Sequence, residues 1–243
     1  MRIAIVSDIH GNLTALDAVL ADLKVMAPDL VVQGGDLAMG GHQAAEVVDR
    51  VRALGWPGVV GNTDEVLWSD ESRAALEKSA PKLGTLLRLI FDDVAATVDL
   101  LGAERVAWMR TLPPEWRSQE AGVAVVHASP GNLWRAPGPE ADEAEASATY
   151  GGLGARVVAY GHIHRPYMRS VAGFTLVNSG SVGSPYDGDP RASYLLVDDG
   201  QVTVRRVAYD VERACRDLLA SGYPHAAWLA EIRRRGAYVQ PSS

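Results

Sequence analysis

The stretch RIAIVSDIHGN, residues 2–12, decides the fold of the first part of the chain. A short β-branched run, Ile3–Ser7, predicts a buried strand. Asp8 and His10 follow this strand directly, and Asn12 can cap a helix whose apolar side chains recur at helical spacing. The stretch therefore predicts a strand, a loop that carries polar side chains, and a helix, in that order.

The same order of elements repeats through the first 60 residues. Leu30–Gln33 predicts a second strand, and a helix with Val47, Val48 and Val51 on one face follows it. Val59–Val60 predicts a third strand. Strands that alternate with helices are typical of a parallel sheet, whose loops gather at the carboxyl ends of the strands.

Residues 65–118 show no convincing strand pattern and predict a helical insertion over one edge of the sheet, with helices at 73–78, 83–101 and 103–112. Strands are expected again at 123–126, 157–160, 175–178, 193–197 and 202–207. The turn residues Asp199-Gly200 favour an antiparallel hairpin between the last two strands, and two helices end the chain. Since no repeat or linker divides the sequence, we expect one domain over residues 1–243.

Composition limits the classes of partner. The chain has 23 Lys and Arg against 30 Asp and Glu, a net charge of −7, so we expect neither a stable nucleic-acid complex nor binding to a membrane. Cys215 is the single cysteine, which excludes an intrachain disulfide and favours a reducing compartment. The first apolar run is too short for a signal peptide, so a cytoplasmic location is expected.

Metal-ligating residues end five of the predicted strands. They are Asp8 and His10, then Asp36, Asn62, His127, and finally His162 and His164. Imidazole and carboxylate together suit first-row divalent ions, with manganese favoured and iron, zinc or nickel also compatible. These side chains are too many for one ion but suit two ions if one ligand is shared. A carboxylate can bridge two metals, whereas an imidazole usually binds one.

The ordered motifs D-x-H, G-D, G-N, H and G-H-x-H resemble those of the calcineurin-like metallophosphoesterases, in particular a small phosphodiesterase-like branch of bacteria and archaea. The resemblance implies a four-layer α-β-β-α sandwich of two mixed sheets. It also implies one metal held by Asp8, His10, Asp36 and His164, and a second held by Asp36, Asn62, His127 and His162, with Asp36 as the bridge. Hydrolysis of a phosphoester by a hydroxide between the two metals follows from the same resemblance.

Two departures from the protein-phosphatase branch bear on the substrate. In that branch a histidine after the G-N asparagine protonates the leaving oxygen, and arginines flank the G-D and G-N motifs. Here Thr63 stands at the histidine position and both arginines are missing. General acid catalysis is worth ~10²–10⁴-fold, so its loss favours good leaving groups and phosphodiesters, unless His42 supplies the proton from another direction. The candidates for roles in catalysis are therefore Asp36, Asn62, His127 and His42.

Other candidate contacts to a small or nucleotide-like phosphoester substrate are Asn62, Thr63, Trp134 and Arg135. The run Arg233–Arg235 predicts a solvated helix face. A broad phosphomonoesterase or nucleotide phosphatase is the alternative enzyme. A non-catalytic scaffold on the same fold is the alternative from another class, although a scaffold is free to lose ligands and every ligand is present here. The sequence does not indicate an oligomeric state.

Overall fold

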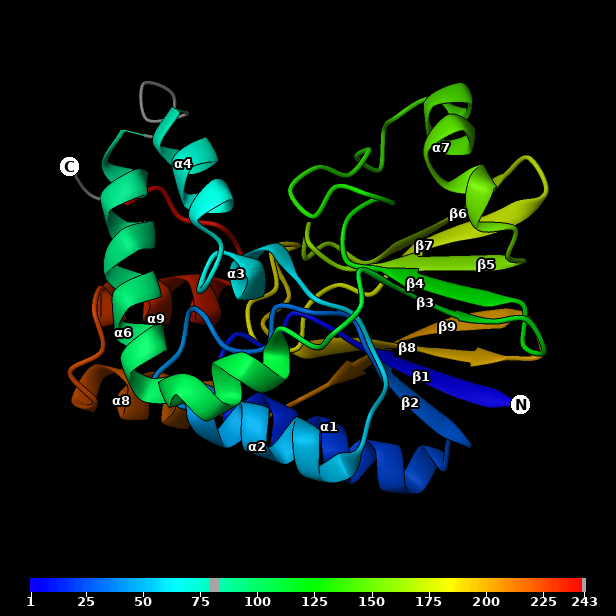
Figure 1. Ribbon diagram of the computed structural model, residues 1–243. Coiled ribbons are helices and arrows are strands. Elements are labelled where there is room, and N and C mark those ends of the chain that lie inside the picture. Colours follow the sequence, from blue (N-terminus) through cyan, green and yellow to red (C-terminus); the bar gives the residue numbers. More distant parts are fainter. Residues whose placement is uncertain (79–83, 242–243) are drawn as a thin grey trace.

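Two mixed β-sheets lie face to face in the computed structural model, which describes residues 1–78 and 84–241 (Figure 1). Helices cover the outer face of each sheet, so the layers run α-β-β-α, as the family resemblance implied. Apolar side chains fill the space between the sheets, among them Ile5, Val125, Ala159 and Leu195. This burial supplies the main stabilisation of the pair of sheets.

The first sheet has the strand order β2-β1-β8-β9. Its strands are β1 (Arg2–Val6), β2 (Leu30–Gln33), β8 (Ala192–Asp198) and β9 (Gln201–Val207). β1 pairs with β2 in parallel and with β8 antiparallel, and β8 and β9 form the expected hairpin. Helices α1 (Leu13–Met26) and α2 (Ala44–Leu54) pack on the outer face.

The second sheet has the order β3-β4-β5-β7-β6. Its strands are β3 (Glu115–Ser118), β4 (Val123–Val126), β5 (Val157–Tyr160), β6 (Tyr167–Val171) and β7 (Phe174–Asn178). The central strands β4, β5 and β7 are parallel, so their carboxyl ends meet at one edge. Helix α7 (Glu143–Tyr150) and the short 3₁₀ helix Gly151–Leu153 lie over this sheet.

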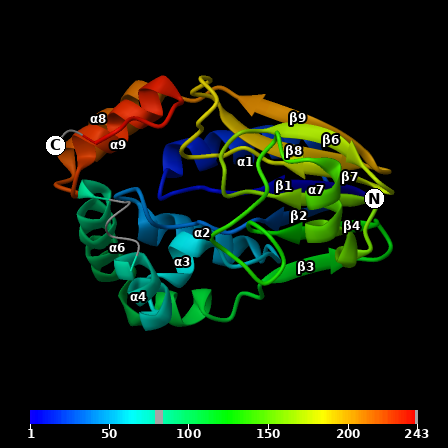
Figure 2. The same cartoon turned by 90° about the horizontal axis from the view of Figure 1, so that it is seen from above.

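The remaining helices gather at the end of the sandwich where these strands end (Figures 1 and 2). They are α3 (Asn62–Glu65), α4 (Asp70–Lys78), α6 (Thr85–Met109), α8 (Val211–Ala220) and α9 (Ala226–Arg235). No helix within residues 1–78 and 84–241 is long and apolar enough to cross a membrane. The predicted helix start at Leu83 lies outside the described residues. The predicted break at Gly102 is confirmed by its φ of 65° and ψ of 171° inside α6.

Three sequence predictions need correction. Val59–Val60 is not a strand, because only Gly58 forms a bridge to Gln33 and the backbone N–H of Val60 donates to Pro113 instead. Glu115–Ser118 lies within the predicted helical insertion but is an edge strand. Three of its four residues are polar, so the sequence lacks the apolar pattern of a strand. Tyr167–Val171 is a second edge strand that the sequence analysis did not predict, because two of its five residues are exposed and the apolar pattern is interrupted.

Candidate metal centre

Four of the predicted ligands converge on one point. The ligand atoms of Asp8, His10, Asp36 and His164 lie within 4.8 Å of one another, and all four residues are buried. His164 Nε2 is 3.1 Å from Asp8 Oδ1 and 3.1 Å from His10 Nε2, while His10 Nε2 is 3.7 Å from Asp36 Oδ2. Two imidazole nitrogens and two carboxylates around a common point form a donor set that fits a first-row divalent ion.

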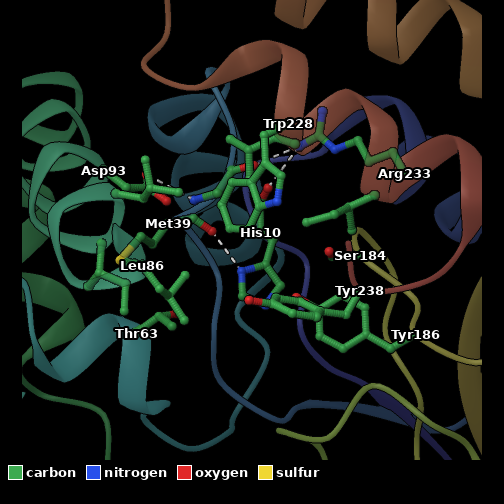
Figure 3. A pocket seen from close by; sticks show the side chains of 15 residues that line it. His10, Met39, Thr63, Leu86, Asp93, Ser184, Tyr186, Trp228, Arg233 and Tyr238 are labelled. Atoms are coloured by element: carbon green, nitrogen blue, oxygen red, sulfur yellow. Dashed lines mark hydrogen bonds between the residues drawn. The ribbon is translucent and has the colours of Figure 1, made fainter. Parts of the chain in front are cut away.

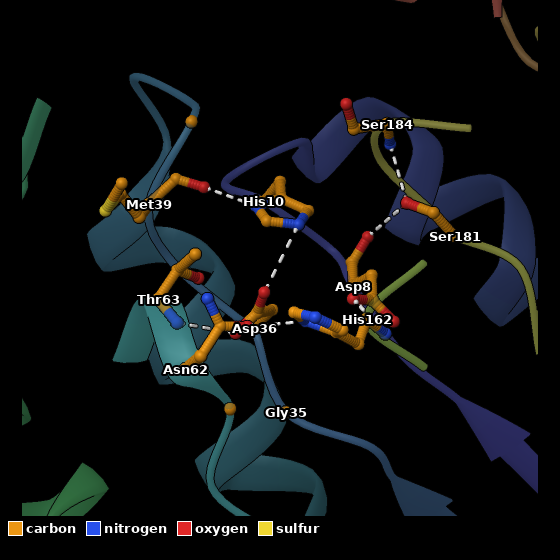
Figure 4. A network of polar contacts seen from close by, with 12 residues as sticks. Asp8, His10, Gly35, Asp36, Met39, Asn62, Thr63, His162, Ser181 and Ser184 are labelled. Carbon is orange, nitrogen blue, oxygen red and sulfur yellow. Dashed lines mark hydrogen bonds and ion pairs between the residues drawn. The ribbon is translucent and has the colours of Figure 1, made fainter. Parts of the chain in front are cut away.

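The remaining three ligands meet beside the Asp36 carboxylate, where Figure 4 shows Asn62 and His162. His127 Nε2 is 3.5 Å from Asp36 Oδ1. The amide oxygen of Asn62 lies 2.8 Å from His127 Nε2 and 2.9 Å from His162 Nδ1. The Asp36 carboxylate therefore faces one ligand group with Oδ2 and the other with Oδ1, which is the placement a bridging carboxylate needs.

Backbone carbonyls orient three of the imidazoles. His10 Nδ1 lies 2.7 Å from the Met39 carbonyl, and His127 Nδ1 lies 2.9 Å from that of Gly34. His164 Nδ1 lies 2.5 Å from the Ser184 carbonyl. Since a carbonyl only accepts hydrogen bonds, Nδ1 carries the proton in each ring and Nε2 keeps its lone pair for a metal.

The backbone at the ligands is held in a costly conformation. Among the described residues, eight that are not glycine have positive φ, and five of these are predicted ligands. These five are Asp8 (56°), His10 (50°), Asp36 (55°), His162 (64°) and His164 (56°). Such conformations cost of order 1–3 kcal/mol each and cluster at functional sites. The strain thus coincides with the residues that the motifs single out.

Glycine is required where loops cross the ligands. A Cβ on Gly61 would lie 2.0 Å from Asp36 Oδ1, and one on Gly161 would lie 2.2 Å from Asp8 Oδ2.

The buried Asp64 carboxylate connects the loop of Asp36 to the loop of Gly61. It accepts hydrogen bonds from the backbone N–H groups of Asp36 (2.8 Å) and Gly61 (3.1 Å). Burial, together with the charge of Asp36, raises the pKa of Asp64 to about 7. Asp64 thus bonds to backbone rather than to a ligand side chain.

The pKa values of most ligands favour the protonation states that bind a metal cation. Burial, reinforced by the charge of His164, lowers the pKa of His10, and burial together with His127 lowers the pKa of His162 to about 4. Burial would raise the pKa of Asp8, but the charge and hydrogen bond of His164 outweigh it and hold that pKa below its usual range. Neutral imidazole beside ionised carboxylate is the form that binds metal.

His127 is the exception. Burial would lower its pKa, but the negative charges of Asp36 and Asp8, with the hydrogen bond to the Gly34 carbonyl, together outweigh burial and raise it. The raised pKa favours the protonated ring, which cannot ligate a metal. Binding of a cation by His127 therefore requires that the ring lose this proton.

The model of the calcineurin-like phosphoesterase superfamily domain matches residues 1–202 of the chain. The chain belongs to this superfamily. This calcineurin-like phosphoesterase is 30% identical over 250 residues to the uncharacterized protein MJ0912 of Methanocaldococcus jannaschii, an alignment that covers 94% of this chain and 96% of that protein. Membership and the buried Asp/His cluster together support metal-dependent hydrolysis of phosphoesters with divalent metal ions.

Solved structures agree on the fold. The crystal structure of a metallophosphoesterase from Sphaerobacter thermophilus is 27% identical, has a TM-score of 0.79, and is matched over 98% of this chain and 100% of its own. The hypothetical protein PH1004 of Pyrococcus horikoshii OT3 is 19% identical with a TM-score of 0.83, over 98% of this chain and 99% of its own. The second comparison bears on the fold alone.

The substrate-side candidates of the phosphoesterase fall in different places. The backbone N–H of Thr63 donates to Asp36 Oδ1 at 2.9 Å, and its buried hydroxyl has no hydrogen-bond partner among the described residues. Trp134 packs partly buried against the core, and Arg135 is exposed. Thr63, but neither Trp134 nor Arg135, lines the cavity beside His10.

His42, the candidate proton donor, lines a different hollow, together with Leu100 and Tyr223. It is not among the residues that line the cavity beside His10. Burial, together with the charge of Arg233, lowers the pKa of His42. The structure therefore does not bring His42 together with Thr63 and the ligands.

The prediction that Arg233 lies on a solvated helix face of the phosphoesterase is wrong. Arg233 is not part of a solvated face but is only 2% exposed, and its Nη2 donates to the carbonyls of His10 (3.2 Å) and Gly40 (3.0 Å). Helix α9 thereby holds the loop of a metal ligand. A signal for this was present, because Arg233 follows Ala230 at i, i+3 and the two share the buried face of the helix.

Proposed function

We propose that this phosphoesterase hydrolyses phosphodiesters of small or nucleotide-like substrates with two divalent ions, manganese being favoured. The observation that carries the proposal is the Asp36 carboxylate, because each of its oxygens faces a separate group of ligands, at 3.7 Å from His10 Nε2 and 3.5 Å from His127 Nε2. A pair of ions held there supplies, when bound, an activated water and positive charge opposite the phosphoryl oxygens.

The side chains of this chain have distinct roles in the proposal. Asp8, His10 and His164 hold one ion with Asp36, and His127, His162 and Asn62 hold the other. The Asn62 amide oxygen faces the two imidazoles, and no described residue accepts a hydrogen bond from its amide nitrogen. That nitrogen is placed to donate to a phosphoryl oxygen and so to orient the substrate for attack.

The preference for diesters rests on what surrounds Asp36. The residue after Asn62 is Thr63, whose hydroxyl is buried without a partner in the described structure and is not an acid near neutral pH. Arg233 is the only cationic side chain among the residues that line the adjoining cavity in the described chain, and its Nη2 is committed to backbone carbonyls. No cationic side chain of this cavity is therefore free to compensate the second negative charge of a phosphomonoester. The lack of a general acid likewise favours substrates with a good leaving group, which leaves without being protonated.

We propose further that residues 1–243 act as one domain. Helix α9 lies beyond the residues that the family model matches, yet Arg233 donates to the carbonyl of His10 in the first loop. The end of the chain thus supports the ligand loop at its beginning.

Paired hydrolysis assays with added manganese test this function. We expect bis-p-nitrophenyl phosphate to be cleaved well above p-nitrophenyl phosphate, and we expect about two ions per chain by elemental analysis. Asp36→Asn should abolish both activities and lower the metal content, whereas Asp17→Asn, a matched change at an exposed ion pair with Arg50, should leave them unchanged. Preference for the monoester would refute the diester assignment and favour a phosphomonoesterase.

A further inference from the structure

A cavity of about 180 Å³ opens beside the metal centre, between α6 and α9 (Figure 3). His10 and Thr63 line its inner end, and both lie against the Asp36 carboxylate. Leu86 and Ile90 of α6 form one wall, and Trp228 of α9 forms the other. A group attached to a phosphoester at Asp36 therefore has this cavity as a neighbouring space.

The walls of the cavity are mostly apolar and are not closed. Asp93 and Arg233 also line the cavity, but both hydrogen-bond to the backbone of Gly40. Leu86, Ile90, Trp228 and Leu229 all keep intermediate exposure in the folded chain, although each is large and apolar. Incompletely covered apolar side chains in a concave site next to catalytic groups are typical of ligand pockets. The cavity thus offers apolar surface that a ligand would remove from water.

The remaining wall is aromatic. The ring of Tyr186 lies 4.4 Å from that of His164 at an angle of 32°, and Tyr238 meets Tyr186 at 5.9 Å and 72°. Trp228 meets Tyr238 at 6.3 Å and 88°, and its Nε1–H donates to the Val239 carbonyl at 2.7 Å, which fixes the indole. A continuous series of rings therefore leads outward from a metal ligand, with edges and faces against which a planar ring packs well.

The size of the cavity matches one ring. An apolar protein cavity of about 150 Å³ binds benzene, so a cavity of about 180 Å³ has room for one ring. We propose that this cavity binds one of the two organic groups of the phosphodiester and that this group is a single aromatic ring. The inference rests on the proposed function of the metal centre. It assigns substrate selection to α6 and α9, and α9 lies outside the region matched by the family model.

Binding of two phosphonates to the manganese-loaded protein, measured by calorimetry, tests the inference without turnover. Phenylphosphonate should bind at least tenfold more tightly than methylphosphonate, because burial of a phenyl ring is worth that much. Trp228→Ala should remove most of this preference and leave methylphosphonate affinity within about twofold. Trp56→Ala, a matched change in a hollow on another surface, should preserve the preference. Leu86→Trp should also reduce the preference, by filling the cavity from the opposite wall while Trp228 stays in place.

The outcomes separate the two proposals. Equal affinities of the two phosphonates for the wild-type protein would overturn the aromatic-ring inference while leaving the metal centre as proposed. The same conclusion would follow if Trp228→Ala and Leu86→Trp, both folded by circular dichroism, kept the full preference. If neither phosphonate bound and no phosphoester was hydrolysed by the metal-loaded protein, the proposed function would fail and the inference would fall with it.

Discussion

Asp93 in α6 should make the stability of the protein fall as the pH rises from about 4 to about 6. Its side chain is 8% exposed, and Oδ1 accepts hydrogen bonds from the Gly40 N–H and the Thr97 hydroxyl, both at 3.3 Å, and from the Tyr223 hydroxyl. Burial raises the pKa of this carboxyl from 3.8 to about 6, and the Tyr223 hydrogen bond only partly opposes the rise. The folded protein therefore keeps a proton on Asp93 that the unfolded chain releases.

The sign and size follow from linkage. A raised pKa contributes stability that is complete below 3.8 and is lost as the pH rises through about 6. At 1.36 kcal/mol for each tenfold change in the ionisation constant, the difference between 3.8 and about 6 corresponds to about 3 kcal/mol. Asp93→Asn keeps an oxygen that accepts the three hydrogen bonds but cannot ionise. We expect the variant to be about 3 kcal/mol more stable than wild type at pH 8 and less than about 1 kcal/mol more stable at pH 4.

Urea unfolding of both proteins at pH 4, 5, 6 and 8, with chelator present throughout, measures this difference. Other groups titrate over the same range, so the difference between variant and wild type is the quantity to follow. Asp99→Asn, on the exposed face of the same helix, should show no such dependence on pH. A constant difference between Asp93→Asn and wild type across the range, or a wild type that is more stable at pH 8, would refute the reasoning.

Three further predictions concern different parts of the molecule. Gly61→Ala would place a Cβ 2.0 Å from Asp36 Oδ1, so we expect loss of bound manganese by elemental analysis with the circular dichroism spectrum unchanged; retention of two ions would contradict this. Leu195→Ala, at a fully buried position between the sheets, should lower the free energy of unfolding by roughly 2–5 kcal/mol in urea, and a loss below about 1 kcal/mol would count against tight packing there. Asp198→Asn removes a 2.7 Å ion pair with Arg2, but both side chains are more than two-fifths exposed (47% and 42%), so the same measurement should change by less than about 1 kcal/mol.

Local patterns in the sequence were sufficient for most of the strands and for the ligands. Apolar runs predicted β1, β2, β4, β5 and β7, because strands buried on both faces need continuous apolar residues. The Asn12 cap is present, with its side chain accepting from the Ala15 N–H at 3.1 Å. The ligands follow strand ends, and parallel pairing brings such ends to one edge, so their convergence could be anticipated before any distance was known.

The two edge strands of the second sheet, β3 and β6, could not be recognised locally. Only one face of Glu115–Ser118 and of Tyr167–Val171 meets the core, so their sequences alternate and contain charges. Val59–Val60 was predicted as a strand because an apolar run was present. Of its two N–H groups, however, only that of Val59 pairs with β2, donating to the Gln33 carbonyl at 3.1 Å, whereas that of Val60 donates to the Pro113 carbonyl. Pairing depends on neighbours that are distant along the chain.

The sequence by itself determined the chemistry of the site. Glycine, histidine and carboxylate residues at fixed spacing after the strands are typical of metal ligands and of few other kinds of site. Only the tertiary structure decided that Asp36 turns one oxygen to each ligand group, and that Arg233 lies buried against the His10 loop. Only it decided that α6 and α9 enclose a cavity beside the centre. The physical reason is that ligand chemistry is a property of single side chains. Orientation, burial and cavities arise from contacts between elements that lie far apart in the sequence.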